Sequence, residues 1–222
     1  MIEQLRNRTE AGQLLAKKLT VYANCSDAIV LGLPRGGVPV AFELAQALNL
    51  PLDIYLVRKL GVPGQEELAM GAIAWGDVMT INEDVVNWLG ISTETIARVA
   101  DKERQELQRR DRMYRGNRPI PDVLHRTVIL VDDGIATGST IRAAIAALRQ
   151  QQPERILVAV PVVSPLTCDR LKAEVDRVVC LIAPTSLSSI SLWYKDFSQT
   201  TDAEVCNLLT QAANRPTTAS LS

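Results

Sequence analysis

Two adjacent carboxylates, Asp132 and Asp133, stand where an apolar run meets a turn of small residues. The run at 127–131 is β-branched and apolar almost throughout, which is typical of a strand buried on both faces. The turn contains glycines and hydroxyl side chains, and good helix formers follow it from about residue 139. The pattern therefore predicts two acids between a buried strand and a helix N-terminus.

A helix N-terminus favours phosphate, because its backbone N–H groups lack partners and its dipole is positive there. Gly138 would let the backbone approach such an anion closely. Hydroxyl donors are available from Thr137, Ser139 and Thr140. Asp132 and Asp133 would repel a phosphate that they faced, so we expect them to accept hydrogen bonds from vicinal hydroxyl groups. Phosphate and diol together suggest ribose 5-phosphate, with an ordinary Asp-Asp-Gly turn as the alternative.

This segment resembles the signature loop of the type I phosphoribosyltransferases, which has an apolar strand, two acids, a few small residues and Thr-Gly-x-Thr. A Walker-type phosphate loop is excluded because no lysine follows Gly138. The resemblance implies that the chain binds 5-phosphoribosyl 1-diphosphate (PRPP), with Asp132 and Asp133 on the ribose hydroxyls. It assigns the 5-phosphate to the small loop, here Ala136, Thr137, Gly138, Ser139 and Thr140.

A second segment is expected at the diphosphate. The apolar run at 28–33 predicts a strand, and a helix is predicted at 38–48. Between them lies Arg35-Gly36-Gly37. Alone this describes any strand–turn–helix unit. The family resemblance assigns an Arg-Gly at this place to pyrophosphate, and so implies that role for Arg35, Gly36 and Gly37.

A third segment, predicted as a strand at 53–58, ends in two cations, Arg58 and Lys59. Cations at a strand end of an open α/β sheet face the ligand crevice. The resemblance likewise places basic residues near the pyrophosphate, while a solvated surface pair is the alternative. The catalytic residues that follow from all three segments are Asp132, Asp133, Arg35 and Lys59, with Arg58, Gly36, Gly37 and the small loop binding PRPP.

The order of elements predicts an α/β fold, a Rossmann-like parallel sheet with helices on both faces, as in the type I phosphoribosyltransferases. Further helices are expected at 9–20, 139–150 and 165–174, and further strands at 127–132, 155–160 and 177–182. We expect one phosphoribosyltransferase domain over 1–213, with an insertion at about 61–122 and a hood at about 183–200. Residues 214–222 are expected to form a disordered tail.

The insertion predicts a hairpin, with strands at 68–75 and 78–82 around Gly76-Asp77. Ser92 can cap a helix that runs to about residue 115, and Gly116 is its stop signal. This helix is basic at its end, with Arg109, Arg110, Arg112, Arg115 and Arg118. A cationic lid over pyrophosphate is one hypothesis, and a solvated helix stabilised by ion pairs one turn apart is the other.

Aromatic residues make up only 4% of the chain, yet Trp193, Tyr194 and Phe197 are close together in the hood. In many phosphoribosyltransferases an aromatic ring of the hood stacks on the nitrogenous base, which the resemblance implies for Trp193 or Tyr194. The alternative is that these rings only pack against other residues.

With 222 residues, 47% of them hydrophobic, the chain can bury one substantial core. Its net charge of −1 gives no general attraction to nucleic acid or to an anionic membrane, and neither is expected as a partner. No apolar run approaches the roughly 20 residues that span a bilayer, and no signal peptide is evident. The cysteines occur without a C-x-x-C pair, which favours reduced thiols and a cytoplasmic location.

The resemblance implies a pentosyltransferase of nucleotide metabolism that uses PRPP and Mg²⁺, transfers the 5-phosphoribosyl group to a nitrogenous base or related acceptor, and releases pyrophosphate. Magnesium is expected on PRPP oxygens and water, so no protein ligand is assigned. Hypoxanthine-guanine relatives carry an aspartate where this chain has Ala136, which counts against a 6-oxopurine acceptor. The alternative is a regulatory protein of the same fold that senses PRPP or a nucleotide without catalysis. The sequence leaves a homodimer open.

Overall fold

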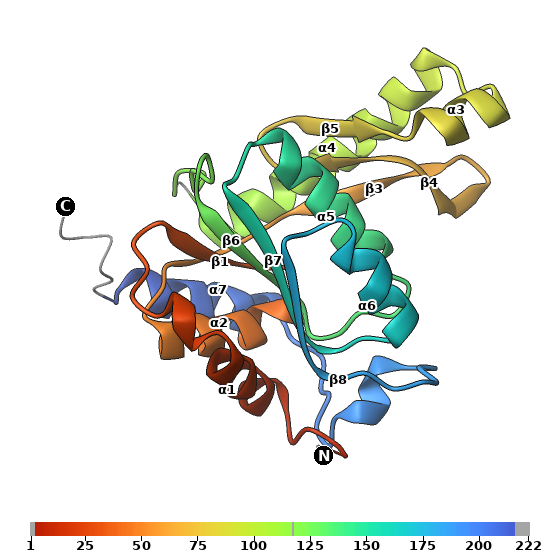
Figure 1. Cartoon of the computed structure of the whole chain (residues 1–222). Helices are drawn as coiled ribbons and strands as arrows, with labels where there is room; N and C mark the ends of the chain where they lie inside the picture. The colour runs from red at the N-terminus through yellow and green to blue at the C-terminus, as the bar shows by residue number, and fades with distance from the viewer. Residues whose placement is uncertain (1–2, 117, 216–222) are drawn as a thin grey trace. The chain divides into compact units, whose positions relative to one another are not determined.

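The computed structural model describes residues 3–116 and 118–215, which form two compact units (Figure 1). The first unit takes the described residues of 1–54, 121–138 and 152–222, and the second takes those of 55–120 and 139–151. The single domain expected over 1–213 stays a prediction. The tail predicted at 214–222 lies outside the described residues from residue 216 onward.

The first unit is built on a five-stranded parallel sheet, in the order β2-β1-β6-β7-β8. Its strands are β1 (Ala28–Gly32), β2 (Leu52–Ile54), β6 (Thr127–Val131), β7 (Arg155–Val162) and β8 (Arg177–Ile182). Every residue of β1 and β6 is buried, which explains why both runs are apolar without alternation. This parallel sheet with flanking helices confirms the predicted α/β class and Rossmann-like architecture.

Helices α1 (Arg8–Lys18) and α2 (Gly37–Leu48) lie side by side and cover one face of this sheet (Figure 1). Leu15 of α1 and Leu44 of α2 are fully buried in the same cluster as Val30 and Ile129 of the sheet. Full burial of a leucine contributes about 1.5–3 kcal/mol, so this layer supplies much of the stability that holds the strand ends in place.

Two more helices complete the first unit. The short helix predicted near 165–174 is observed as α6 (Pro165–Lys172), which begins at the cap Ser164 and contacts β8. Helix α7 (Asp202–Ala213) was not predicted, and it packs against α2 and β2. Two short 3₁₀ segments are η1 (Thr20–Tyr22) and η2 (Ile190–Trp193). The segment at 183–200, expected as a hood, contains η2 and an isolated bridge at Tyr194 and otherwise no regular helix or strand, and α7 follows it.

The second unit contains a three-stranded antiparallel sheet, β3-β4-β5. Its elements are β3 (Val57–Val62), β4 (Gln65–Ala74), β5 (Val78–Ile81), α3 (Glu83–Leu89), α4 (Thr93–Arg115) and α5 (Ser139–Gln150). The predicted hairpin is confirmed, and its turn uses positive φ at Gly76 and Asp77, 81° and 59°. The predicted long helix is confirmed with Ser92 as its N-cap and Gly116 as its C-cap. Helix α5 contacts all three strands.

The prediction of one strand at 53–58 is wrong. The chain leaves the parallel sheet after β2 and enters the antiparallel sheet at β3, with Tyr55 and Leu56 between them. The Leu56 carbonyl already accepts a hydrogen bond from the Trp75 N–H at 3.1 Å. The apolar pattern did not reveal this change of sheet, because Ile54, Tyr55, Leu56 and Val57 form one unbroken apolar run across it. Arg58 and Lys59 therefore lie inside β3 and not at the end of a parallel strand.

Among the residues that the structure describes, no helix has the length and apolar character needed to cross a membrane.

Candidate active site

The loop after β6 stays attached to the parallel sheet. The Ile135 N–H donates to the Val162 carbonyl at 2.8 Å, and Ile135 pairs with Val163 in a parallel bridge. The Thr167 hydroxyl donates to the Ala136 carbonyl at 3.3 Å. The backbone then turns at Gly138, whose φ of +82° is costly for any residue with a Cβ. Helix α5 begins at the next residue, so the predicted strand–turn–helix arrangement is confirmed.

The loop presents small side chains to solvent. Ala136, Thr137 and Thr140 are exposed, while Gly138 is buried. The anion site expected at this turn stays a prediction. Ser139 and Thr140 are assigned to the second unit as the first residues of α5.

The Arg35-Gly36-Gly37 turn lies directly against the acid pair. A Cβ on Gly37 would be 2.7 Å from the Val131 carbonyl oxygen and 2.8 Å from Cα of Asp132. A Cβ on Gly36 would overlap the Asp133 carboxylate and lie 2.6 Å from its Cγ. Real Cβ atoms do not approach other atoms this closely, so a side chain at Gly37 would displace backbone, and one at Gly36 would displace the Asp133 carboxylate. Two motifs almost one hundred residues apart are therefore in contact.

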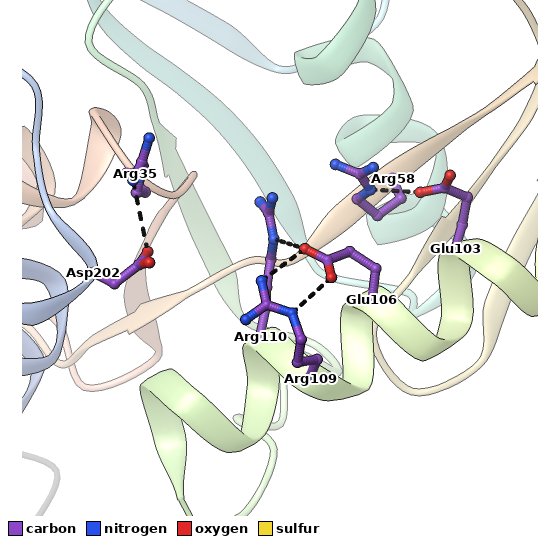
Figure 2. Close-up of polar contacts among 7 residues, drawn as sticks. All are labelled: Arg35, Arg58, Glu103, Glu106, Arg109, Arg110 and Asp202. Carbon is purple, nitrogen blue, oxygen red and sulfur yellow. Dashed lines mark hydrogen bonds and ion pairs between the residues drawn. The ribbon is translucent and has the colours of Figure 1, made fainter.

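The β1–α2 turn is also tied to the end of β6. The Leu33 N–H donates to the Val131 carbonyl at 2.8 Å, and the Gly37 N–H donates to the Leu33 carbonyl at 3.0 Å. The Pro34–Arg35 peptide bond is cis. Arg35 itself is only loosely held, since its guanidinium is 4.0 Å from the Asp202 carboxylate and its side chain is 38% exposed (Figure 2). Arg35 is thus accessible to an anionic ligand.

Asp133 is held by residues that the sequence did not indicate. Nε and Nη2 of Arg8 each lie 2.8 Å from Oδ2 of Asp133. The Arg8 guanidinium also stacks 4.0 Å from the centre of the Phe197 ring, and its Nη1 donates to the Ser198 carbonyl at 2.7 Å. The one local signal was a cation in the first turn of α1, where the helix dipole disfavours positive charge.

The two aromatic residues predicted to stack on a base differ in burial. Tyr194 is only 3% exposed, its ring packs 4.9 Å from that of Phe197, and its hydroxyl donates to the Asp133 carbonyl at 2.7 Å. Burial raises the pKa of its hydroxyl. These contacts favour the alternative for Tyr194, a packing and anchoring role. Trp193 is half-buried against the core, and its stacking role stays a prediction.

Asp132 is affected by its burial and by its neighbour Asp133. Burial and the neighbouring Asp133 charge raise the pKa of Asp132 well above its ordinary value of 3.8. Oδ1 of Asp132 accepts a hydrogen bond from the Asp133 N–H at 2.9 Å, which opposes that rise. Hydroxyl groups of a ligand bound here would donate hydrogen bonds to the Asp132 carboxylate. These bonds would replace the ones to water that burial has removed.

Comparisons with known proteins identify the family of this chain. The model of the phosphoribosyl transferase domain matches residues 1–192. This chain belongs to the phosphoribosyl transferase family. A candidate phosphoribosyl transferase of Mycobacterium tuberculosis is 41% identical over 206 residues, which are 93% of this chain and 46% of that protein. The chain thus spans about half the length of the curated relatives that it matches most fully.

Two more relatives extend the comparison. The crystal structure of TT1426 from Thermus thermophilus is 39% identical, with a TM-score of 0.86 over 94% of this chain and 98% of that one. A uracil phosphoribosyltransferase of Sulfolobus acidocaldarius is 46% identical over 56 residues, 25% of this chain and 26% of that protein. The predicted membership of the phosphoribosyltransferase family is confirmed.

The two remaining predicted cations, Arg58 and Lys59, belong to the second unit. Nε of Arg58 donates to Glu103 of α4 at 2.6 Å (Figure 2), and Lys59 pairs with Glu67 at 3.3 Å. Their position inside β3 and these carboxylate partners give each a structural task within the second unit. Their role at the diphosphate stays a prediction.

The arginines proposed as a cationic lid are largely engaged in the second unit. Glu106 accepts hydrogen bonds from Arg109 and Arg110 at 2.8 and 2.7 Å (Figure 2), and these lower the pKa of Glu106 to about 2. Arg115 is buried with its guanidinium 3.5 Å from the centre of the Trp75 ring. Arg118 donates to the Tyr114 carbonyl at 2.9 Å. These contacts favour the alternative of a helix stabilised by its own neighbours.

Proposed function

We propose that this protein binds PRPP with Mg²⁺ and transfers the 5-phosphoribosyl group to a nitrogenous base or related acceptor, with release of pyrophosphate. The observation that supports this proposal is the contact of Gly36 and Gly37 with Asp132 and Asp133. PRPP carries a diphosphate and a diol on adjacent carbons of one sugar ring, so its two recognition elements must themselves be adjacent.

Each group of the ligand has a proposed partner in the first unit. The exposed loop that ends at Gly138 would bind the 5-phosphate through backbone N–H groups. Asp132 and Asp133 would accept hydrogen bonds from the ribose hydroxyls. Arg35, with its exposed guanidinium, would bind the diphosphate. Ser139 and Thr140 follow this loop along the chain, and their hydroxyls remain proposed phosphate donors.

The chemistry requires charge stabilisation more than proton transfer. Cleavage of the bond between C1 and the diphosphate builds positive charge on the sugar and negative charge on the leaving group. Arg35 would stabilise the leaving group, and loss of one preorganised contact of this kind typically costs on the order of 3 kcal/mol in the barrier. The acids would hold the ring in place while its charge develops.

In this proposal Mg²⁺ binds together with PRPP, through its phosphate oxygens. Within the described residues there is no group of three or more His, Cys, Asp or Glu side chains that could hold a metal ion. Mg²⁺ commonly binds through substrate phosphates and water with one or two carboxylates, and it would neutralise the diphosphate when bound.

The acceptor is proposed by class only. Ala136 stands where hypoxanthine-guanine relatives have an aspartate, so adenine-like and pyrimidine-like bases take precedence. The partial match to a uracil phosphoribosyltransferase makes uracil the first base to test.

The direct test is pyrophosphate release from PRPP and Mg²⁺ with a panel of uracil, orotate, adenine and hypoxanthine. We expect release with one class of base, none after magnesium chelation, and a large loss in Asp133→Ala. Arg6→Gln is the matched control, because Arg6 lies near Arg8 in sequence but its side chain is 75% exposed. Tight PRPP binding with no turnover across the panel would favour the sensor, and absence of PRPP binding would refute the proposal.

A further inference from the structure

Arg8 is far more constrained than a surface arginine. Its side chain is 11% exposed, and its guanidinium contacts three different partners: the Asp133 carboxylate, the Ser198 carbonyl and the Phe197 ring. All of these residues belong to the first unit. A planar guanidinium suits this arrangement, since it donates in fixed directions and stacks on an aromatic face at the same time.

The location of Arg8 is unfavourable for helix stability alone. It is the first residue of α1, directly after the cap Asn7, where the helix dipole disfavours a cation. The segment before it is anchored to the hood, because Leu5 pairs with Tyr194 and the Asp196 N–H donates to the Arg6 carbonyl at 2.9 Å. The chain therefore fixes a cation at a helix N-terminus, and the carboxylate of Asp133 compensates for it.

The contacts are asymmetric at the carboxylate. Both Nε and Nη2 of Arg8 reach the same oxygen, Oδ2. Within the described part of the chain, no donor is paired with the other oxygen, Oδ1. The main chain of Asp133 is also fixed, by the Tyr194 hydroxyl on its carbonyl and by Asp132 on its N–H. One carboxylate oxygen is thus held by the protein while the second keeps its capacity to accept.

We propose that Arg8 is a positioning residue for the sugar: it fixes Asp133 through Oδ2 so that Oδ1 faces a ribose hydroxyl. This inference rests on the proposed function, because it takes the acid pair as the diol site.

The test compares two probes, ribose 5-phosphate and 2-deoxyribose 5-phosphate, by titration calorimetry on the full chain. The wild type should prefer ribose 5-phosphate, and Arg8→Gln should reduce that preference about tenfold, since charge-assisted contacts no longer orient the acceptor. Arg8→Lys should restore part of it by keeping the charge. Arg6→Gln should leave it unchanged. Loss of folded protein lowers the apparent number of sites for both probes equally, so the ratio of affinities reports on positioning alone.

The outcomes separate the two proposals. A wild type that binds neither probe, or binds both equally, refutes the diol assignment and the inference with it. If the wild type prefers ribose 5-phosphate and Asp133→Ala abolishes the preference, the diol site is supported. Should Arg8→Gln then keep the full preference, or bind ribose 5-phosphate more tightly than the wild type, Arg8 does not position Asp133 and only the inference fails.

Discussion

Substitution of Gly36 by alanine tests the contact on which the site depends. The backbone of Gly36 has φ −59° and ψ −30°, which alanine adopts without strain. At such a position a change to alanine ordinarily stabilises a protein by about 0.4–1 kcal/mol, because it restricts the unfolded chain. Here the new Cβ would overlap the Asp133 carboxylate and lie 2.6 Å from Cγ. Asp133 cannot withdraw freely, since Arg8 holds its Oδ2.

Two opposing effects therefore set the expected change. Overpacking at a constrained site costs about 1–3 kcal/mol, so Gly36→Ala should lower the free energy of unfolding despite its favourable backbone. All three close contacts of the new Cβ are to side-chain atoms of Asp133. In an Asp133→Ala background the clash disappears, and the same substitution should stabilise the protein by up to about 1 kcal/mol.

Urea unfolding of the wild type, both single variants and the double variant gives the coupling energy. We expect the double variant to be more stable, by more than about 1 kcal/mol, than the sum of the two single effects predicts. Gly37→Ala is the control, because its Cβ would meet the backbone of Val131 and Asp132, and removal of the Asp133 side chain does not relieve that clash. Equal effects of Gly36→Ala in the two backgrounds would refute the proposed contact.

Other substitutions probe the acids and the loop. Asp132 has a raised pKa, so the folded state binds its proton more tightly than the unfolded chain, and stability falls as pH rises above 3.8. Asp132→Asn should therefore raise the melting temperature at pH 7 but not at pH 3, and an equal shift at both would contradict the pKa. Tyr194→Phe leaves the Asp133 carbonyl without its 2.7 Å donor and should cost about 1–3 kcal/mol in urea unfolding; no loss would show that water replaces the hydroxyl. Gly138→Ala, at φ +82°, should cost about 1–2 kcal/mol and weaken phosphate binding in calorimetry, and unaltered binding would place the anion elsewhere.

The parts of the fold that the sequence predicted are those with local signals. Strand β6 is a continuous apolar run, and α5 was predicted at 139–150 and is observed over the same residues. The long helix of the insertion has a serine cap and a glycine stop, both of which are used. Helices α3 and α7 were not predicted, although Asn82 and Thr201 precede acidic first turns, a pattern typical of a helix N-terminus.

The parts that the sequence did not predict depend on long-range contacts. No local pattern indicates that β2 ends after three residues, because the change of partner strand is set by the hairpin further along the chain. The same limit applies to the site. Arg8 and Asp133 are 125 positions apart, and their ion pair follows from the way α1 and the hood pack, not from either motif.

Asp133 links the separate parts of the proposed site. The turn that carries Arg35 touches its carboxylate through Gly36, the N-terminal helix holds Oδ2 through Arg8, and the hood anchors its carbonyl through Tyr194. A shift of the hood or of α1 must therefore move this acid relative to the diphosphate turn, because packed groups with no free volume transmit displacement. It follows that substitutions in the hood that touch no ligand, such as Phe197→Leu, should alter PRPP affinity through the orientation of Asp133. Phe197→Leu combined with Arg8→Gln should then weaken binding no more than Arg8→Gln alone, and full additivity of the two losses would show that the hood acts by another route.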